Sequence, residues 1–148
     1  MPTISKKITI AITTLTLILL ASCDLETSDN GKLDGQWHLI QIQDLTTNQT
    51  QDLTQQYYYW QFQGKLLQLR NTETHEQYLL RFQHDNTTLR TYEPYIYNRE
   101  EGDQPITDPQ PLNPFGITQI DQTFEIEHLG NKYITLKSPT VRLSLKRF

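Results

Sequence analysis

The residue with the most distinctive chemistry in this sequence is its single cysteine, Cys23. A thiolate is a good nucleophile, and a lone thiol leaves no partner for an internal disulfide. Lys6 and Lys7 stand upstream, followed by an apolar run over residues 8–20 that four threonines dilute. That run has thirteen residues, whereas a membrane-spanning helix needs about 20. A basic pair, a short apolar run and small residues in this order are typical of a cleavable export signal.

The stretch Leu20-Ala21-Ser22-Cys23 resembles the lipobox of bacterial lipoproteins. The resemblance implies that a peptidase removes residues 1–22 as a signal peptide and that Cys23 carries lipid. Two or more acyl chains anchor a protein stably, whereas one holds it only marginally. The expected location is therefore the cell envelope, with the protein lipid-anchored at the outer membrane on its periplasmic or surface face. An ordinary secretory signal with a chance cysteine is the alternative.

Residues 23–34 are polar and acidic and lack hydrophobic periodicity, which predicts a flexible tether. The acidic residues after Cys23 resemble the surface-export signal of lipoproteins from Bacteroidota. In enterobacteria, Asp24 directly after the cysteine would instead imply retention in the inner membrane, so lineage decides which membrane and which face.

Composition limits the classes of partner. Without residues 1–22 the chain has 126 residues, enough for one domain, with 11 Lys and Arg against 17 Asp and Glu, a net charge of −6. Proteins that bind nucleic acids present a basic surface to the phosphates. The sequence therefore predicts no nucleic-acid partner, and no electrostatic binding to an anionic membrane face.

The spacing of the carboxylate and imidazole side chains in this sequence does not indicate a catalytic or metal-binding site. Glu125 and Glu127 are two residues apart in a predicted strand, so both point the same way, into solvent. His128 would then face the barrel interior, either as a ligand-lining residue or as a hydrogen-bonded histidine of the core or rim. His75 and His84 are nine residues apart and lie on opposite faces if one unbroken strand joins them, which makes them poor joint metal ligands.

The remaining candidates for chemistry are also predicted to be structural. The charged segment 99–103 lacks the regularly spaced Asp, Asn and Gly residues of a calcium-binding loop. No serine or threonine lies in a nucleophile elbow, and no glycine loop of the phosphate-binding kind occurs. We therefore expect no enzyme activity, no cofactor and no metal site.

From Gly35 onward the apolar residues recur with a period of two, which predicts strands. Counting one strand across a bulge near Pro94, eight strands are predicted. They span residues 35–43, 57–63, 66–70, 75–84, 87–97, 123–129, 132–138 and 141–148. The proline-rich segment 98–121 is predicted to be a loop or broken helix, and its part 112–117 is apolar enough to pack on the barrel.

The connections alternate in length along the predicted strands. Tight turns at 64–65, 85–86 and 130–131 fall at one end of an up-and-down meander, and the long connections 44–56 and 98–121 fall at the other. The fold class predicted for residues 35–148 is therefore all-β, an eight-stranded antiparallel up-and-down barrel. A β-sandwich is the alternative architecture.

The motif Gly35-Gln36-Trp37 at the start of the first strand resembles the Gly-x-Trp motif of lipocalins. More broadly, residues from about 33 to 148 resemble small lipocalin-like lipoproteins of Bacteroidota, a group without an established function. The segments most like that group are 35–37, 112–117 and 124–148. In lipocalins the tryptophan plugs the closed end of the barrel under an arginine from the last strand. The phase of the last strand makes Arg147 the candidate to stack on Trp37.

Aromatic side chains are the last feature of the sequence that bears on function. One alternating set is predicted to point inward and either to fill the barrel or to line a ligand cavity. The inward set comprises Tyr58, Trp60, Phe62, Tyr78 and Phe82. Tyr57 and Tyr59 would then lie outside, where exposed aromatics can mark a partner surface.

Two functions follow from these alternatives. An open cavity indicates a module that binds a small hydrophobic or amphipathic ligand at the loop-rich end. A filled barrel indicates a non-catalytic envelope protein that presents loops or surface aromatics to a protein partner. In both cases the chain enters the barrel at the tightly turned end, so a lipid on Cys23 would hold that end toward the membrane and leave the long loops facing away.

Overall fold

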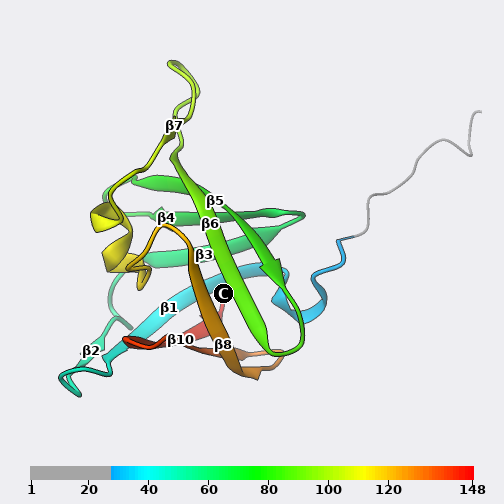
Figure 1. Cartoon of the computed structure of the whole chain (residues 1–148), viewed down its shortest axis with the longest axis vertical. Helices are drawn as coiled ribbons and strands as arrows, with labels where there is room; N and C mark the ends of the chain where they lie inside the picture. The colour runs from blue at the N-terminus through cyan, green and yellow to red at the C-terminus, as the bar shows by residue number, and fades with distance from the viewer. Residues whose placement is uncertain (1–27) are drawn as a thin grey trace, which may run out of the picture.

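The computed structural model describes residues 28–148 (Figure 1). The predicted signal peptide, Cys23 and the first part of the predicted tether lie outside these described residues. Within residues 28–148, no helix is long and apolar enough to cross a membrane.

Eight antiparallel strands form a closed barrel, as the sequence predicts. Around the barrel the order is β1, β3, β4, β5, β6, β8, β9 and β10, and β10 pairs again with β1. That last pairing closes the sheet and excludes the β-sandwich. The strands are β1 (Gly35–Asp44), β3 (Tyr58–Gln63), β4 (Leu66–Asn71), β5 (Gln77–His84), β6 (Thr88–Ile96), β8 (Gln122–Leu129), β9 (Tyr133–Lys137) and β10 (Val141–Arg147).

Short strands and 3-10 helices lie in the segments outside the eight barrel strands. β2 (Thr50–Asp52) pairs with β1 and lies in the long polar connection 44–56, where the sequence predicts no strand, and β7 (Gln104–Pro105) pairs with the end of β6. Two 3-10 helices, η2 (Gly31–Leu33) and η3 (Gln110–Phe115), stand before β1 and after β7. The connections 44–56 and 98–121 therefore carry structure of their own.

The two ends of the barrel differ as the turn lengths predict. The closed end consists of η2, the turns at 64–65, 85–87 and 130–132, and the end of β10. The loop-rich end consists of the connections 45–57, 72–76, 97–121 and 138–140. In Figure 1 the blue N-terminal segment leaves the barrel on the right and η3 lies on the left, so the chain enters at the closed end and the long connections lie opposite.

Three bulges interrupt the regular alternation of side chains. In β1 the register against β10 shifts between Leu39 and Gln41. In β6 the register against β5 shifts where Glu93 takes a positive φ of 50° before Pro94, at the bulge that the sequence predicts. In β8 the register against β9 shifts between Ile126 and His128. Beyond this bulge in β8 the inward and outward faces of the strand exchange.

The interior of the barrel is filled with side chains. Trp37, Trp60, Phe115 and Phe124 are all fully buried, and Phe62 is nearly so. Leucines, isoleucines and a valine on the inward faces of the other strands pack around these rings. A small barrel of eight strands has an interior just wide enough for such filling. The packed core is therefore the architecture observed, and it occupies the space that an open ligand cavity would need.

Candidate functional site

The closed end is built around Trp37, which the Gly-x-Trp motif places at the start of β1. Its indole Nε1 donates a hydrogen bond of 2.8 Å to the carbonyl oxygen of Leu33. The guanidinium carbon of Arg147 lies 4.1 Å from the centre of the Trp37 ring, in the stacked position that the phase of the last strand predicts. Because Leu33 is fully buried beneath them, the last residues of the predicted tether belong to the packed barrel rather than to a flexible segment.

Arg147 also holds the closed end together through its hydrogen bonds. It donates to three backbone carbonyl oxygens, which come from two segments of the chain. The acceptors are Lys32 at 2.6 Å, Asp34 at 2.8 Å and Asn131 at 2.8 Å. A planar guanidinium can satisfy several acceptors at once, which an ammonium on a single stem cannot do with the same geometry. Trp37 and Arg147 are therefore structural residues here.

Gly35 is required by this same arrangement. Its φ of +108° lies in a region that favours glycine. A Cβ at this position would stand 2.8 Å from Nη1 of Arg147. The Gly-x-Trp motif thus combines the backbone turn, the ring and the space for the guanidinium that covers the ring.

The loop-rich end is capped by η3. Phe115, near the end of this helix, meets the ring of Tyr58 edge-on at 5.1 Å between centroids and that of Tyr78 at 5.9 Å. Its carbonyl oxygen accepts a hydrogen bond of 3.1 Å from the indole Nε1 of Trp60. Because Leu112 of the same helix is also fully buried, η3 acts as a plug in the barrel opening.

Gly116 ends the plug in a left-handed conformation with φ +85°. A Cβ there would stand 2.4 Å from Cδ2 of Leu143 in β10, so the backbone approaches the barrel wall too closely for any side chain. The apolar segment 112–117 does pack on the barrel, as its composition predicts. Its role as a cap was not predictable from the pattern, because a proline-rich segment carries no periodicity that shows which face it covers.

Most of the predicted inward aromatics lie in the core beneath this plug. Trp60, Phe62, Tyr78 and Phe82 are buried, with Phe62 and Phe82 in edge-to-face contact at 5.0 Å, whereas Tyr58 is half-buried at the rim. The structure brings these five predicted residues together as one packed cluster. They contact one another and the plug instead of lining an empty cavity.

The prediction that His128 faces the interior is wrong, because the bulge in β8 turns it outward and Leu129 packs against the core instead. Tyr59 lies on the outer face as predicted, but it is only 8% exposed and so does not form the expected aromatic surface. The ring of His38 stacks on it and the ring of Phe148 meets it edge-on.

A surface hollow of about 500 Å³ lies beside the plug at the loop-rich end. Tyr78 and Ile96, which are paired across β5 and β6, form its apolar floor, and Ile96 is 44% exposed. Glu76, Arg99 and Glu100 stand around the hollow. It is therefore an open site with a small apolar floor and a charged rim.

The hollow has perturbed electrostatics at one residue. Burial raises the pKa of the Tyr78 hydroxyl, and the negative charge of Glu76 and a hydrogen bond to its carboxylate raise it further. Tyr78 therefore stays protonated at neutral pH, and its hydroxyl, which donates its proton to Glu76, can still accept a hydrogen bond.

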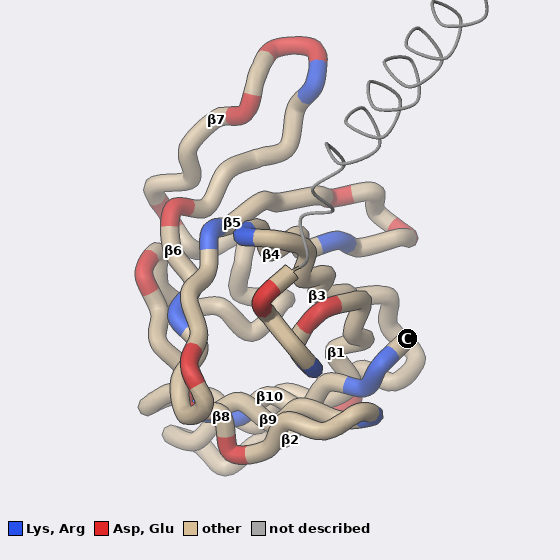
Figure 2. The backbone as a smooth tube through the Cα atoms, turned by 90° about the vertical axis from the view of Figure 1, so that its right-hand side faces the viewer, with Lys and Arg blue, Asp and Glu red and all other residues tan. Residues whose placement is uncertain are grey.

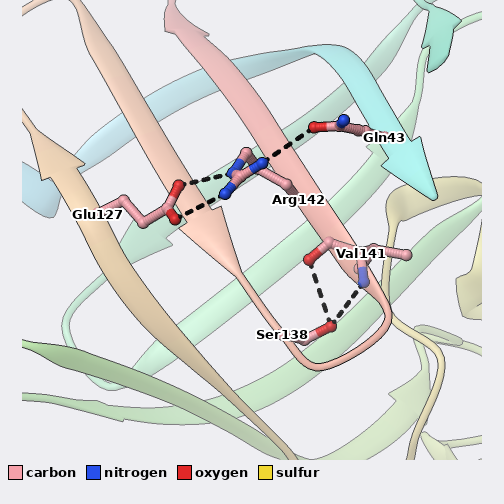
Figure 3. A network of polar contacts seen from close by, with 5 residues as sticks. All are labelled: Gln43, Glu127, Ser138, Val141 and Arg142. Carbon is pink, nitrogen blue, oxygen red and sulfur yellow. Dashed lines mark hydrogen bonds and ion pairs between the residues drawn. The ribbon is translucent and has the colours of Figure 1, made fainter. Parts of the chain in front are cut away.

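The acidic pair in β8 does not form an acid–base site. Glu125 is exposed, while Glu127 accepts two hydrogen bonds from Arg142, at 2.7 and 3.0 Å (Figure 3). These hydrogen bonds, followed by the positive charges of Arg142 and Lys137, lower the pKa of Glu127. Figure 3 also shows Arg142 reaching Gln43 at 3.1 Å, so it ties β8 and β10 to β1.

The described residues hold no group of three or more His, Cys, Asp and Glu side chains placed to bind a metal ion. His75 lies in the turn before β5 rather than in the strand. His84 ends β5 and stacks on the ring of Phe82.

Comparison with known proteins identifies the family. A family model described as a lipocalin-like domain matches residues 18–148. The chain belongs to the lipocalin-like domain family. No curated protein matches it.

Two solved structures share the lipocalin-like fold. One is a lipocalin-like protein from Bacteroides uniformis, with a TM-score of 0.60 and 15% identity, covering 80% of this chain and 100% of the other. The second is an uncharacterised protein from Bacteroides eggerthii, with a TM-score of 0.57 and 15% identity, covering 78% of this chain and 99% of the other. At this identity the likeness concerns the fold alone.

Proposed function

We propose that this protein is a lipid-anchored, non-catalytic binding module of the cell envelope that holds a small amphipathic molecule at its loop-rich end. The anchoring part rests on the lipobox-like sequence around Cys23. The binding part rests on one observation, the hollow beside η3 with its apolar floor and charged rim. Binding sites for small molecules are concave, mostly apolar and supplied with a few polar groups, and the mouths of β-barrels are among their common positions.

The apolar part of the ligand would lie on Tyr78 and Ile96, next to the plug. Its polar part would meet the hydroxyl of Tyr78 and the guanidinium of Arg99, which also stands over the ring of Tyr97 at 5.5 Å. Because the barrel interior is filled, the ligand would occupy the surface of the barrel mouth and not its centre.

Native mass spectrometry of the protein purified from its own host tests this proposal, with a co-purifying small molecule as the expected result. The dye 1-anilinonaphthalene-8-sulfonate serves as an amphipathic probe of the hollow. We expect Ile96→Glu to weaken dye binding at least fivefold, and the control Leu66→Glu, at a similarly exposed leucine of the closed end, to leave it unchanged. Equal dye binding in both variants, without a co-purifying molecule, would count against the proposal.

A second function is favoured by the filled interior. A barrel without a central cavity can serve as a rigid support for a protein partner, with Tyr57, which is 46% exposed just before β3, as a contact. The covering of Tyr59 reduces the aromatic surface that the sequence predicted there. A co-purifying protein that is lost on Tyr57→Ser would favour this function over the first.

A further inference from the structure

Basic side chains gather at the closed end of the barrel. Four lysines there, Lys32, Lys65, Lys132 and Lys146, are exposed. The hydrogen bonds of Arg147 bring two of them to its neighbour Lys146, since its side chain donates to the carbonyl of Lys32 and its backbone N–H donates to that of Lys132 at 2.8 Å. Figure 2 looks onto this end, and blue segments lie beside the C-terminus.

Exposed aromatic rings stand among these lysines. Phe148 is 77% exposed and Tyr133 is 46% exposed. Tyr133 pairs directly with Lys146 across β9 and β10. Phe148 is fixed in place, because its backbone N–H donates to the carbonyl of Gln36 at 2.9 Å and its ring meets Tyr59. Aromatic rings and lysines side by side are the combination found where proteins meet the headgroup layer of a membrane.

The acidic residues lie mostly at the opposite end of the barrel. The loop-rich end carries Asp44, Asp52, Glu73, Glu76, Glu100, Glu101, Asp103, Asp108 and Asp121. The closed end has Asp29, Asp34 and Asp85. Among the described residues, the ion pairs use Arg81, Arg90 and Arg142 and none of the four lysines. A net acidic chain thus presents a basic surface at one end only.

The chain also enters the barrel at this basic end. Asn30 is buried there, and its amide donates to the carbonyl of Gly64 at 2.7 Å, beside Lys65. Cys23 precedes Asn30 by seven residues, which span at most about 25 Å when extended. A lipid on Cys23 would hold the closed end within reach of the bilayer surface.

We propose that the closed end lies against anionic phospholipid headgroups, with Lys32, Lys132 and Lys146 facing the phosphates and Phe148 and Tyr133 in the headgroup layer. This inference rests on the proposed anchoring for its orientation, whereas the surface itself consists of described residues. It identifies the partner of this surface as an anionic bilayer. Docked in this way, the barrel holds its acidic loop-rich end and the hollow away from the membrane.

The test uses the protein isolated from the membranes of its host and placed in vesicles of phosphatidylethanolamine and phosphatidylglycerol or of phosphatidylcholine alone. Phe148→Trp introduces a reporter at the closed end, and Tyr57→Trp introduces one at the loop-rich end. The native Trp37 and Trp60 are fully buried and contribute a constant background. We expect brominated lipid to quench the Phe148→Trp reporter at least twofold more than the Tyr57→Trp reporter, and only in the anionic vesicles.

Two triple variants of equal charge change separate this surface from net charge. K32Q/K132Q/K146Q should abolish the extra quenching, as should about 0.5 M salt. Q51E/Q104E/Q110E makes the same charge change at exposed positions of the loop-rich end and should leave the quenching intact. Equal quenching of the two reporters, or quenching that is the same in phosphatidylcholine, would overturn the proposal.

The mass of the N-terminal peptide reports separately whether Cys23 carries lipid. If it carries none, the anchoring proposal fails, and flotation of the same protein with the anionic vesicles then tests the surface directly. Flotation that K32Q/K132Q/K146Q abolishes would support the surface, and a protein that stays at the bottom of the gradient would contradict it.

Discussion

Gly35 shows how one residue type can depend on a distant part of the chain. Its positive φ and the nearness of Nη1 of Arg147 both exclude a side chain. Arg147 cannot easily move aside, because three backbone carbonyls and the ring of Trp37 hold its guanidinium. The motif and the last strand therefore form one unit, although the whole barrel separates them in sequence.

Gly35→Ala should destabilise the protein by about 2–3 kcal/mol, since it adds backbone strain and displaces a hydrogen-bonded guanidinium. Gly64→Ala is the matched control, because Gly64 also has a positive φ but nothing lies within 4 Å of its added Cβ. That control should cost only about 1 kcal/mol. Urea denaturation followed by tryptophan fluorescence measures both, and equal losses would contradict the role given to Arg147.

Arg147→Lys should cost about 2 kcal/mol, because a lysine loses the stacked guanidinium and part of its set of hydrogen bonds. Arg70→Lys, on the outer face of β4, provides the control and should leave the midpoint of urea denaturation unchanged. If the two conservative changes have the same effect, the closed end does not depend on guanidinium geometry.

At the scale of elements, η3 decides whether the barrel is open or filled. Phe115→Ala should cost about 3–5 kcal/mol, as expected for a large ring removed from a packed site. It should also raise binding of the dye 1-anilinonaphthalene-8-sulfonate, because the rings of Tyr58 and Tyr78 lose their cover. Phe148→Ala removes the same ring from a position that is 77% exposed and should do neither. A Phe115→Ala variant with native stability and native dye binding would show that η3 is not a plug.

The β5–β6 turn predicts a specific dependence of stability on pH. Backbone hydrogen bonds from Thr87 and Thr88, aided by their hydroxyls, lower the pKa of Asp85 from 3.8 to about 2. A carboxyl whose pKa is lowered by folding stabilises the protein above its unfolded pKa, and this contribution is lost as the pH falls from about 4 to about 2. Asp85→Asn should therefore narrow the difference in urea midpoint between about pH 6 and about pH 3, and a difference as large as in the parent protein would contradict this role of Asp85.

The elements show where sequence patterns succeed and where they fail. Strand phase placed Arg147 over Trp37 and the aromatic rings of β3 and β5 inside the barrel, because a period of two is a local property. The bulge at Ile126 adds one residue to a strand without a local signal, so the side to which His128 points could not be read. The cover over Tyr59 depends on the register of three strands and on the C-terminal residue, which no single stretch of sequence contains.

At the scale of the whole molecule, net charge and charge distribution lead to opposite expectations about binding to an anionic membrane. A net charge of −6 argues against binding to an anionic membrane face. That value is the sum of the charges at both ends of the barrel. Only the closed topology shows that Lys32, Lys132 and Lys146, far apart in sequence, lie together, while the acidic loops lie at the other end. A local field depends on nearby charges, because salt screens exposed charges beyond about 8 Å at physiological ionic strength.

This separation of charge predicts a pattern of protease access on the membrane. On vesicles that contain phosphatidylglycerol, trypsin should cut after Lys32 and Lys132 several-fold more slowly than in detergent, because the bilayer covers the closed end. Cutting after Arg99, in the connection at the loop-rich end, should proceed at the same rate in both, since that end faces the solvent. Mass spectrometry of the released peptides measures all three sites, and a rate at Arg99 that falls together with the rates at the lysines would mean that the barrel has no fixed orientation on the membrane.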